Sequence, residues 1–280
     1  MPASVKSSLV GAAHQLRRLV PASAAPAIVR RKVDKLWSND AYRELQEAQM
    51  RHLLEFTDRA PEIPVLARRY AEEALLKTHL RWHPRLITRE PVRGIEWLTT
   101  RRDPSRSIVL NFMHHYRYEG MFKSLKDKGV DLDILATPLW SDQTQSAPFR
   151  HHLNIVASGG RMIRAVGGTD KFVEMVKPGM VIAIASDLPG HTEMTFLGRR
   201  VRGSFGAARI AALTNSQVVI IRAMKDEGGT YLQVDPPLEP SDFAGPKELL
   251  DAMLRRHEEA VLAWPEVVDM PRARFAAIED

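Results

Sequence analysis

The sequence contains no cysteine. This absence excludes disulfide bonds, thiolate ligands for zinc and a cysteine nucleophile. Long apolar runs are also absent, because the longest, such as those at 180–185 and 218–221, are far shorter than the ~20 residues that a membrane-spanning helix requires. The apolar pieces near the amino terminus are interrupted by Pro21 and Pro26, unlike those of a secretory signal. We therefore expect a cytoplasmic protein without a transmembrane segment.

Charge is unevenly distributed along the 280 residues. The formal net charge of +6 equals the contribution of residues 1–37, whose one acid is Asp34 and whose bases are Lys6, Arg17, Arg18, Arg30, Arg31, Lys32 and Lys35. Apolar residues are interspersed with these bases, so residues 1–36 can lie on an anionic membrane surface, where each base contributes roughly 1 kcal/mol. A solvated basic tail is the alternative. Nucleic acid is not expected as a partner, since no aromatic residues for base stacking accompany the bases.

Two regions with different patterns follow this basic segment. In residues 37–100, Ser38 and Asn39 can cap a helix that continues to about Phe56, and a second apolar stripe at helical spacing follows Pro64 and ends before Pro84. From residue 101 onward, short β-rich runs alternate with amphipathic segments. The runs lie at 107–112, 132–136, 180–186, 217–223 and 230–235, and the helical segments at about 119–128, 169–177, 204–214 and 247–263.

This alternation predicts an α/β fold with a mainly parallel central sheet flanked by helices and a helical N-terminal extension. We expect one domain over residues 37–280, with a helical part at 37–100 and an α/β part at 101–280. Ligands of such sheets bind beyond the carboxyl ends of the strands. The residues that follow each β-rich run are therefore the candidates for a site.

Chemically active residues are densest after the first run, at 111–120, which reads Asn-Phe-Met-His-His-Tyr-Arg-Tyr-Glu-Gly. We expect His114 at a strand end and Glu119 in the first turn of the next helix, within hydrogen-bonding reach of one imidazole nitrogen. Glu119 would then fix the tautomer, and the other nitrogen would take a proton from a substrate hydroxyl. A hydroxyl activated in this way can attack a thioester without a covalent enzyme intermediate. His115 has Gly120 at the same spacing, so His114 alone has a carboxylate partner.

These residues resemble the lysophospholipid acyltransferase superfamily, specifically its lipid A lauroyl/myristoyl acyltransferase and phosphatidylinositol mannoside acyltransferase branch. His114 and Glu119 match the family's His-x4-Asp/Glu signature after a strand. A second block, 167–187, is similar to the family's helix, basic turn, strand and terminal acid, which here is Asp187. A third block, 196–221, is similar to its Phe-x-Gly, Gly-initiated helix with an internal arginine, here Arg209.

The resemblance extends over about 107–268 and carries further expectations. Arg161 matches an arginine that members place near the active site, with Arg164 as the alternative after a small shift. The resemblance implies that Arg161, Arg209 and Asp187 contact the substrate, although Asp187 can also cap the next turn through Gly190. A fixed guanidinium suits a phosphate or a developing oxyanion.

The resemblance also implies the reaction and its partners. A fatty acyl chain would pass from acyl-CoA or acyl carrier protein to a hydroxyl of a glycolipid or lysolipid, with no metal and no cofactor besides the thioester co-substrate. The protein would be peripheral on the inner face of the cell membrane, where it meets its lipid acceptor. His114 and Glu119 would be the catalytic dyad.

The chain departs from the family pattern at several points, and two other functions stay open. Tyr118 stands where members often have Trp, and Pro265 and Glu266 are followed by VVDMPRARF rather than a basic-aromatic motif. A non-catalytic lipid-binding or scaffold protein would fit the basic amino terminus. A metal hydrolase would use clustered imidazoles and a carboxylate, drawn from His114, His115, His151, His152 and Glu119.

Overall fold

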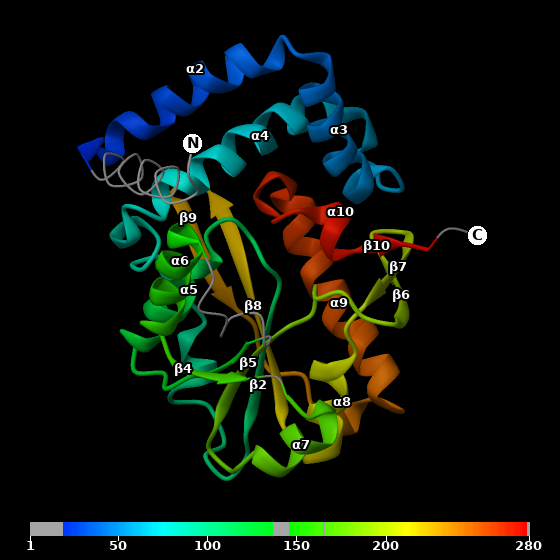
Figure 1. The fold of residues 1–280 in the computed structure, drawn as a ribbon. Helices are drawn as coiled ribbons and strands as arrows, with labels where there is room; N and C mark the ends of the chain where they lie inside the picture. The colour runs from blue at the N-terminus through cyan, green and yellow to red at the C-terminus, as the bar shows by residue number, and fades with distance from the viewer. Residues whose placement is uncertain (1–18, 137–145, 165, 279–280) are drawn as a thin grey trace, which may run out of the picture.

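The computed structural model describes residues 19–136, 146–164 and 166–278. These residues form an α/β fold around a seven-stranded sheet with the order β1-β9-β8-β2-β5-β3-β4 (Figure 1). Five neighbouring strands are parallel: β8 (Gln217–Asp226), β2 (Ile108–Phe112), β5 (Val181–Ala185), β3 (Asp133–Ala136) and β4 (Arg161–Arg164). β9 (Gly229–Val234) is antiparallel to β8, and β1 (Val92–Arg93) is parallel to β9. The predicted mainly parallel sheet is confirmed.

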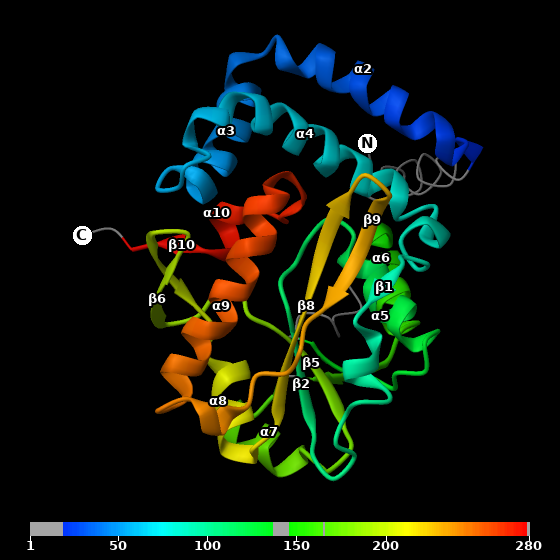
Figure 2. The same cartoon turned by 180° about the vertical axis from the view of Figure 1, so that it is seen from behind.

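Helices cover both faces of this sheet, as Figures 1 and 2 show. One face packs against α5 (Tyr118–Lys126) and α6 (Ala147–Ala157), and the other against α8 (Gly206–Thr214) and α9 (Pro246–Ala263), while α7 (Gly168–Met175) contacts α8. Every residue of β2 and of β5 is buried. Strands covered on both faces are continuous apolar runs rather than alternating ones, which is why the sequence predicts them well.

The helical extension consists of α2 (Ala25–Trp37), α3 (Asp40–Leu54) and α4 (Ile63–Leu80). Asn39 caps α3, because its side-chain oxygen accepts a hydrogen bond from the Tyr42 N–H at 3.1 Å. Val29 and Val33 of α2 pack with Ala71 of α4. In Figure 1 these three helices lie beyond the end of the sheet at which β8 finishes. None of the helices in the described ranges is long and apolar enough to cross a membrane.

Several short elements were not predicted. β6 (Thr192–Phe196) and β7 (Arg199–Gly203) form a hairpin, which β10 (Ala276–Ala277) extends to a three-stranded antiparallel sheet. α10 (Pro271–Arg274) precedes β10 and positions part of the site. Short 3₁₀ turns connect the larger elements: η2 (Ala22–Ala24), η3 (Ala60–Glu62), η4 (Pro84–Leu86), η5 (Ile95–Leu98), η7 (Pro240–Asp242) and η8 (Pro265–Val267).

Candidate active site

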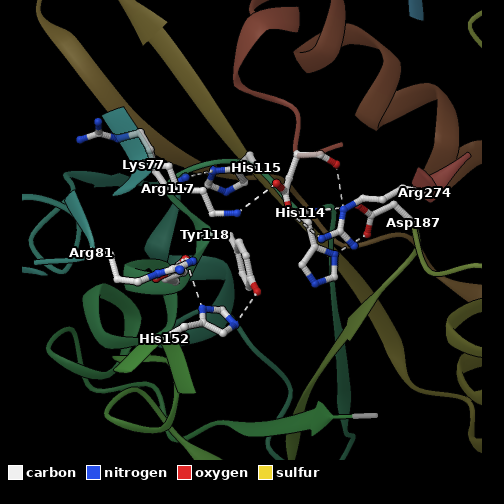
Figure 3. Close-up of polar contacts among 11 residues, drawn as sticks. Lys77, Arg81, His114, His115, Arg117, Tyr118, His152, Asp187 and Arg274 are labelled. Atoms are coloured by element: carbon white, nitrogen blue, oxygen red, sulfur yellow. Dashed lines mark hydrogen bonds and ion pairs between the residues drawn. The ribbon is translucent and has the colours of Figure 1, made fainter. Parts of the chain in front are cut away.

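The pairing of β2 with β5 brings His114 and Asp187 together. The two strands are parallel neighbours with Phe112 opposite Ala185, so the residues two positions later leave the sheet side by side. His114 Nδ1 lies 2.7 Å from Asp187 Oδ1, and the His114 backbone N–H donates to Oδ2 at 2.8 Å (Figure 3). One carboxylate therefore fixes both the ring and the backbone of the histidine.

Asp187 is fully buried, yet it is charged. Burial alone would raise the pKa of its carboxyl, but the nearby charge and hydrogen bonds of His114 and the charge of Arg274 outweigh burial and lower the pKa. An ionised carboxylate only accepts hydrogen bonds, so Nδ1 of His114 carries the proton. When the imidazole is neutral, its Nε2 nitrogen has a lone pair that can accept a proton from a ligand, as a general base must.

The structure corrects the expected partner of His114. The Glu119 carboxylate faces Arg81, whose Nε donates to its two oxygens at 3.1 and 3.0 Å and whose Nη2 is also bonded to it. His152 Nδ1 lies 3.2 Å from Glu119 Oε1. Burial raises the pKa of Glu119, but the hydrogen bonds from His152 and Arg81 outweigh burial and lower the pKa to about 2. Asp187, not Glu119, is hydrogen-bonded to the ring of His114.

Gly120 explains why Glu119 meets Arg81. The start of α5 lies directly against the backbone after α4, and a Cβ at Gly120 would be 2.1 Å from the carbonyl oxygen of Ile87. Only glycine permits this approach. The segment from Arg81 to Ile87 is thereby held on α5, and Arg81 reaches the carboxylate of Glu119. The glycine after the His-x4-Glu pattern thus determines which residue its glutamate contacts.

The two predicted substrate-contacting arginines lie away from His114. Arg161 begins β4 and forms an ion pair with Asp133, the first residue of β3, at 2.6 Å. These amino ends of the strands are at the opposite edge of the sheet, so the structure does not bring Arg161 to His114 as expected. Arg164, the alternative, is the last residue of β4 and lies at the carboxyl edge. Arg209 of α8 is half exposed and pairs with Asp170 of α7 at 3.3 Å.

The segment after α9 supplies residues that the sequence did not reveal. The Asp269 N–H donates to the carbonyl of His114 at 3.1 Å, which attaches this segment to the histidine loop. The Asp269 carboxylate accepts from Lys77 at 3.0 Å and from Arg274 at 2.7 Å. Arg274 Nε also lies 3.5 Å from Asp187 Oδ2. Burial raises the pKa of Asp269, but the charges of Lys77 and Arg274 outweigh burial and lower it to about 2.

A cavity of about 290 Å³ lies over these side chains, and His114 and Arg274 line it. Part of its wall is apolar, formed by Phe112, Phe122, Ile134, Leu135, Phe149 and Leu188. The remainder is polar and includes Lys77, Arg81, Tyr118, His152 and Asp269. A site with apolar residues on part of its wall and a few convergent polar groups suits a ligand that has an apolar chain and a polar end.

The histidines proposed for a metal site do not converge. The buried ring of His115 has its pKa lowered to about 3 by burial and by the charges of Arg117 and His114, so it is neutral. His151 Nε2 is 2.7 Å from the Arg81 carbonyl oxygen, and its ring stacks on Trp82. Within the described part of the chain, no three His, Asp or Glu side chains lie close enough together to hold a metal ion.

Comparison with known proteins gives a weak structural likeness. No family model matches the chain, and no curated protein matches it. The fold is similar to the crystal structure of the 1-acyl-sn-glycerophosphate (LPA) acyltransferase, PlsC, from Thermotoga maritima, with a TM-score of 0.43 and 15% sequence identity. The similarity covers 89% of this chain and 96% of that chain.

Proposed function

We propose that this protein is an O-acyltransferase that moves a fatty acyl chain from a thioester donor, acyl-CoA or acyl carrier protein, to a hydroxyl of a glycolipid or lysolipid. One observation carries the proposal. The His114 ring is bonded through Nδ1 to a buried, ionised Asp187 and lines a cavity with an apolar wall and a polar rim. That cavity suits a fatty chain beside a reacting group, and the histidine suits a base.

The reaction follows from the protonation states of the pair. Nε2 of His114 removes the proton of the acceptor hydroxyl as its oxygen forms a bond with the thioester carbonyl carbon. The positive charge on the imidazole is stabilised by Asp187. The carbon–sulfur bond then breaks, sulfur leaves as a thiolate, and the imidazolium returns the proton to the thiolate or to water. No covalent enzyme intermediate is needed.

The cleanest test of this activity is lipid analysis in cells with and without the gene, followed by assays with the purified full chain. We expect one acylated lipid to disappear with the gene and to return with the wild-type sequence but not with His114→Ala. Purified protein should transfer acyl groups from acyl-CoA or acyl carrier protein to the same acceptor. Binding to liposomes without any acyl transfer would instead identify a non-catalytic lipid-binding protein.

The outer face of α2 supports a membrane-surface location on the inner face of the cell membrane. Ile28, Arg31, Lys32 and Lys35 recur at helical spacing and are exposed, while Val29 on the opposite face is buried. Because α2 packs on α4, which contributes Lys77 to the cavity rim, a lipid surface at α2 would lie near the cavity. An exposed basic face of this kind attracts anionic lipids.

Neutralising this face should weaken membrane binding. The triple variant Arg31→Gln, Lys32→Gln, Lys35→Gln should bind anionic vesicles roughly a hundredfold more weakly, since each base contributes about 1 kcal/mol. Vesicle sedimentation at several salt concentrations measures the effect. The matched control is Lys126→Gln, Lys128→Gln, Lys171→Gln, which removes three exposed charges around α5 and α7. Equal loss in both variants, or binding that is independent of salt, would refute the electrostatic docking.

A further inference from the structure

A second series of polar side chains enters the same cavity from α5 and α6. His152 Nδ1 lies 3.2 Å from Glu119 Oε1, and its Nε2 lies 3.1 Å from the Tyr118 hydroxyl. The Tyr118 ring stands perpendicular to the His114 ring, with ring centroids 4.6 Å apart. Both Tyr118 and His152 line the cavity, and Figure 3 shows the hydroxyl directed at His152 beside the ring of His114.

The Tyr118 hydroxyl can donate a hydrogen bond toward the cavity as well as toward His152. The ionised Glu119 carboxylate lies beside the His152 ring, with Oε1 3.2 Å from Nδ1. The other ring nitrogen, Nε2, lies 3.1 Å from the Tyr118 oxygen and can be its donor or its acceptor, so rotation about the C–O bond can direct the hydroxyl proton to a ligand in the cavity. Burial raises the pKa of Tyr118 well above its ordinary value, so the phenol keeps its proton and remains a donor.

We propose, resting on the acyl transfer proposed above, that the Tyr118 hydroxyl donates a hydrogen bond to the thioester carbonyl oxygen as that oxygen becomes an oxyanion. Attack by the acceptor oxygen moves the carbonyl electron pair onto this oxygen, beside Tyr118. The pair returns when the carbon–sulfur bond breaks and sulfur leaves as a thiolate. Tyr118 gives up no proton in either step. His152 and Glu119 are positioning residues, since they act through Tyr118.

The neighbouring cations are less suited to this role, because a carboxylate already engages each one. Lys77 and Arg274 are bonded to Asp269, and Arg81 is bonded to Glu119. Moving one of them to a substrate oxygen would break a buried ion pair, which is costly. Tyr118 needs at most a rotation of its hydroxyl about the C–O bond. Preorganised donors of this kind are the main way in which enzymes stabilise an oxyanion.

The first test compares two tyrosines that are two positions apart in the full-length protein. Tyr118→Phe should lower kcat for an acyl-pantetheine thioester, the group common to both donor types, by roughly 10²- to 10³-fold with little change in KM. Tyr116→Phe is the control, because the Tyr116 hydroxyl is hydrogen-bonded to Tyr70. The control should resemble the wild type. If Tyr118→Phe also retains wild-type turnover, the inference about Tyr118 is wrong while the proposed function stands.

The second test measures binding without turnover. Two inert analogues of the acyl-pantetheine are compared by calorimetry: a ketone, in which a methylene replaces sulfur, and a thioether, in which a methylene replaces the carbonyl. Wild type should prefer the ketone, and Tyr118→Phe should lose that preference while binding the thioether unchanged. An unchanged preference in Tyr118→Phe overturns the inference. A wild-type enzyme that transfers no acyl group to any acceptor overturns the proposed function itself.

The positioning role of His152 can be tested by comparing its variants in the wild-type and Tyr118→Phe backgrounds. His152→Ala should lower kcat in the wild-type background but have little further effect in Tyr118→Phe, because both changes remove the same interaction. His152→Gln keeps an amide donor near the Nε2 position and should recover part of the lost kcat. Equal losses in both backgrounds, with no recovery by glutamine, would show that His152 acts only on the fold and would overturn its positioning role.

Discussion

Replacing His114 by alanine should lower the rate of acyl transfer by roughly 10²- to 10⁴-fold, because this is what positioned acid–base catalysis contributes. The fold should persist, since the backbone of His114 keeps its hydrogen bonds to Asp187 and Asp269. Steady-state kinetics with the natural acceptor measures the effect, and thermal unfolding checks the fold.

The matched control for this change is His191→Ala. His191 is exposed on the loop before β6, so its removal takes away an imidazole without touching the cavity lining. Its variant should keep the wild-type rate. Ordinary turnover by His114→Ala, in a sample that unfolds at the wild-type temperature, would reject His114 as the base.

The second large effect concerns the carboxylate that orients the base. Asp187→Asn should lower kcat almost as much as His114→Ala, because an amide has one acceptor oxygen for the two His114 contacts and its neutral side chain no longer stabilises the imidazolium. Glu119→Gln should cost less, since its carboxylate is bonded to Arg81 and lies beside His152 rather than His114. A larger loss of kcat in Asp187→Asn than in Glu119→Gln would identify Asp187, and not Glu119, as the carboxylate that orients His114.

A measurement that is independent of activity supports the same comparison. The proton between His114 Nδ1 and Asp187 Oδ1, which are 2.7 Å apart, should give a low-field proton resonance. Asp187→Asn should abolish this resonance and Glu119→Gln should preserve it. The reverse result, with the larger kinetic loss in Glu119→Gln, would contradict Asp187 as the partner of the base.

The central strands were predictable because burial on both faces makes them continuous apolar runs. β2, β5 and β8 each coincide with such a run. β4 was not predicted, since it is a short edge strand that begins with Arg161 and ends with Arg164, both exposed. The β6–β7 hairpin has exposed polar residues at alternate positions and lies outside the main sheet, so it lacks the continuous apolar run that marks the central strands.

The site was only partly predictable, for a reason of topology. His114 and Asp187 are each identifiable as polar residues that follow an apolar run, but their contact depends on β2 and β5 being neighbours. Spacing along the chain favoured Glu119 instead, which the close approach at Gly120 directs to Arg81. Asp269 reaches the site from a distant segment, and local sequence carries no signal for such a contact.

The attachment of Asp269 to the histidine loop has a consequence for biosynthesis. All seven strands of the large sheet precede residue 235, so the sheet can assemble on the ribosome while the stretch with Asp269 and Arg274 is still untranslated. At that stage Lys77 lacks its partner Asp269, and Asp187 lacks its guanidinium neighbour Arg274. Among the described elements, the last to be synthesised therefore supply the remaining charged neighbours of the site around His114. The sheet of a nascent chain can form before the pocket is complete.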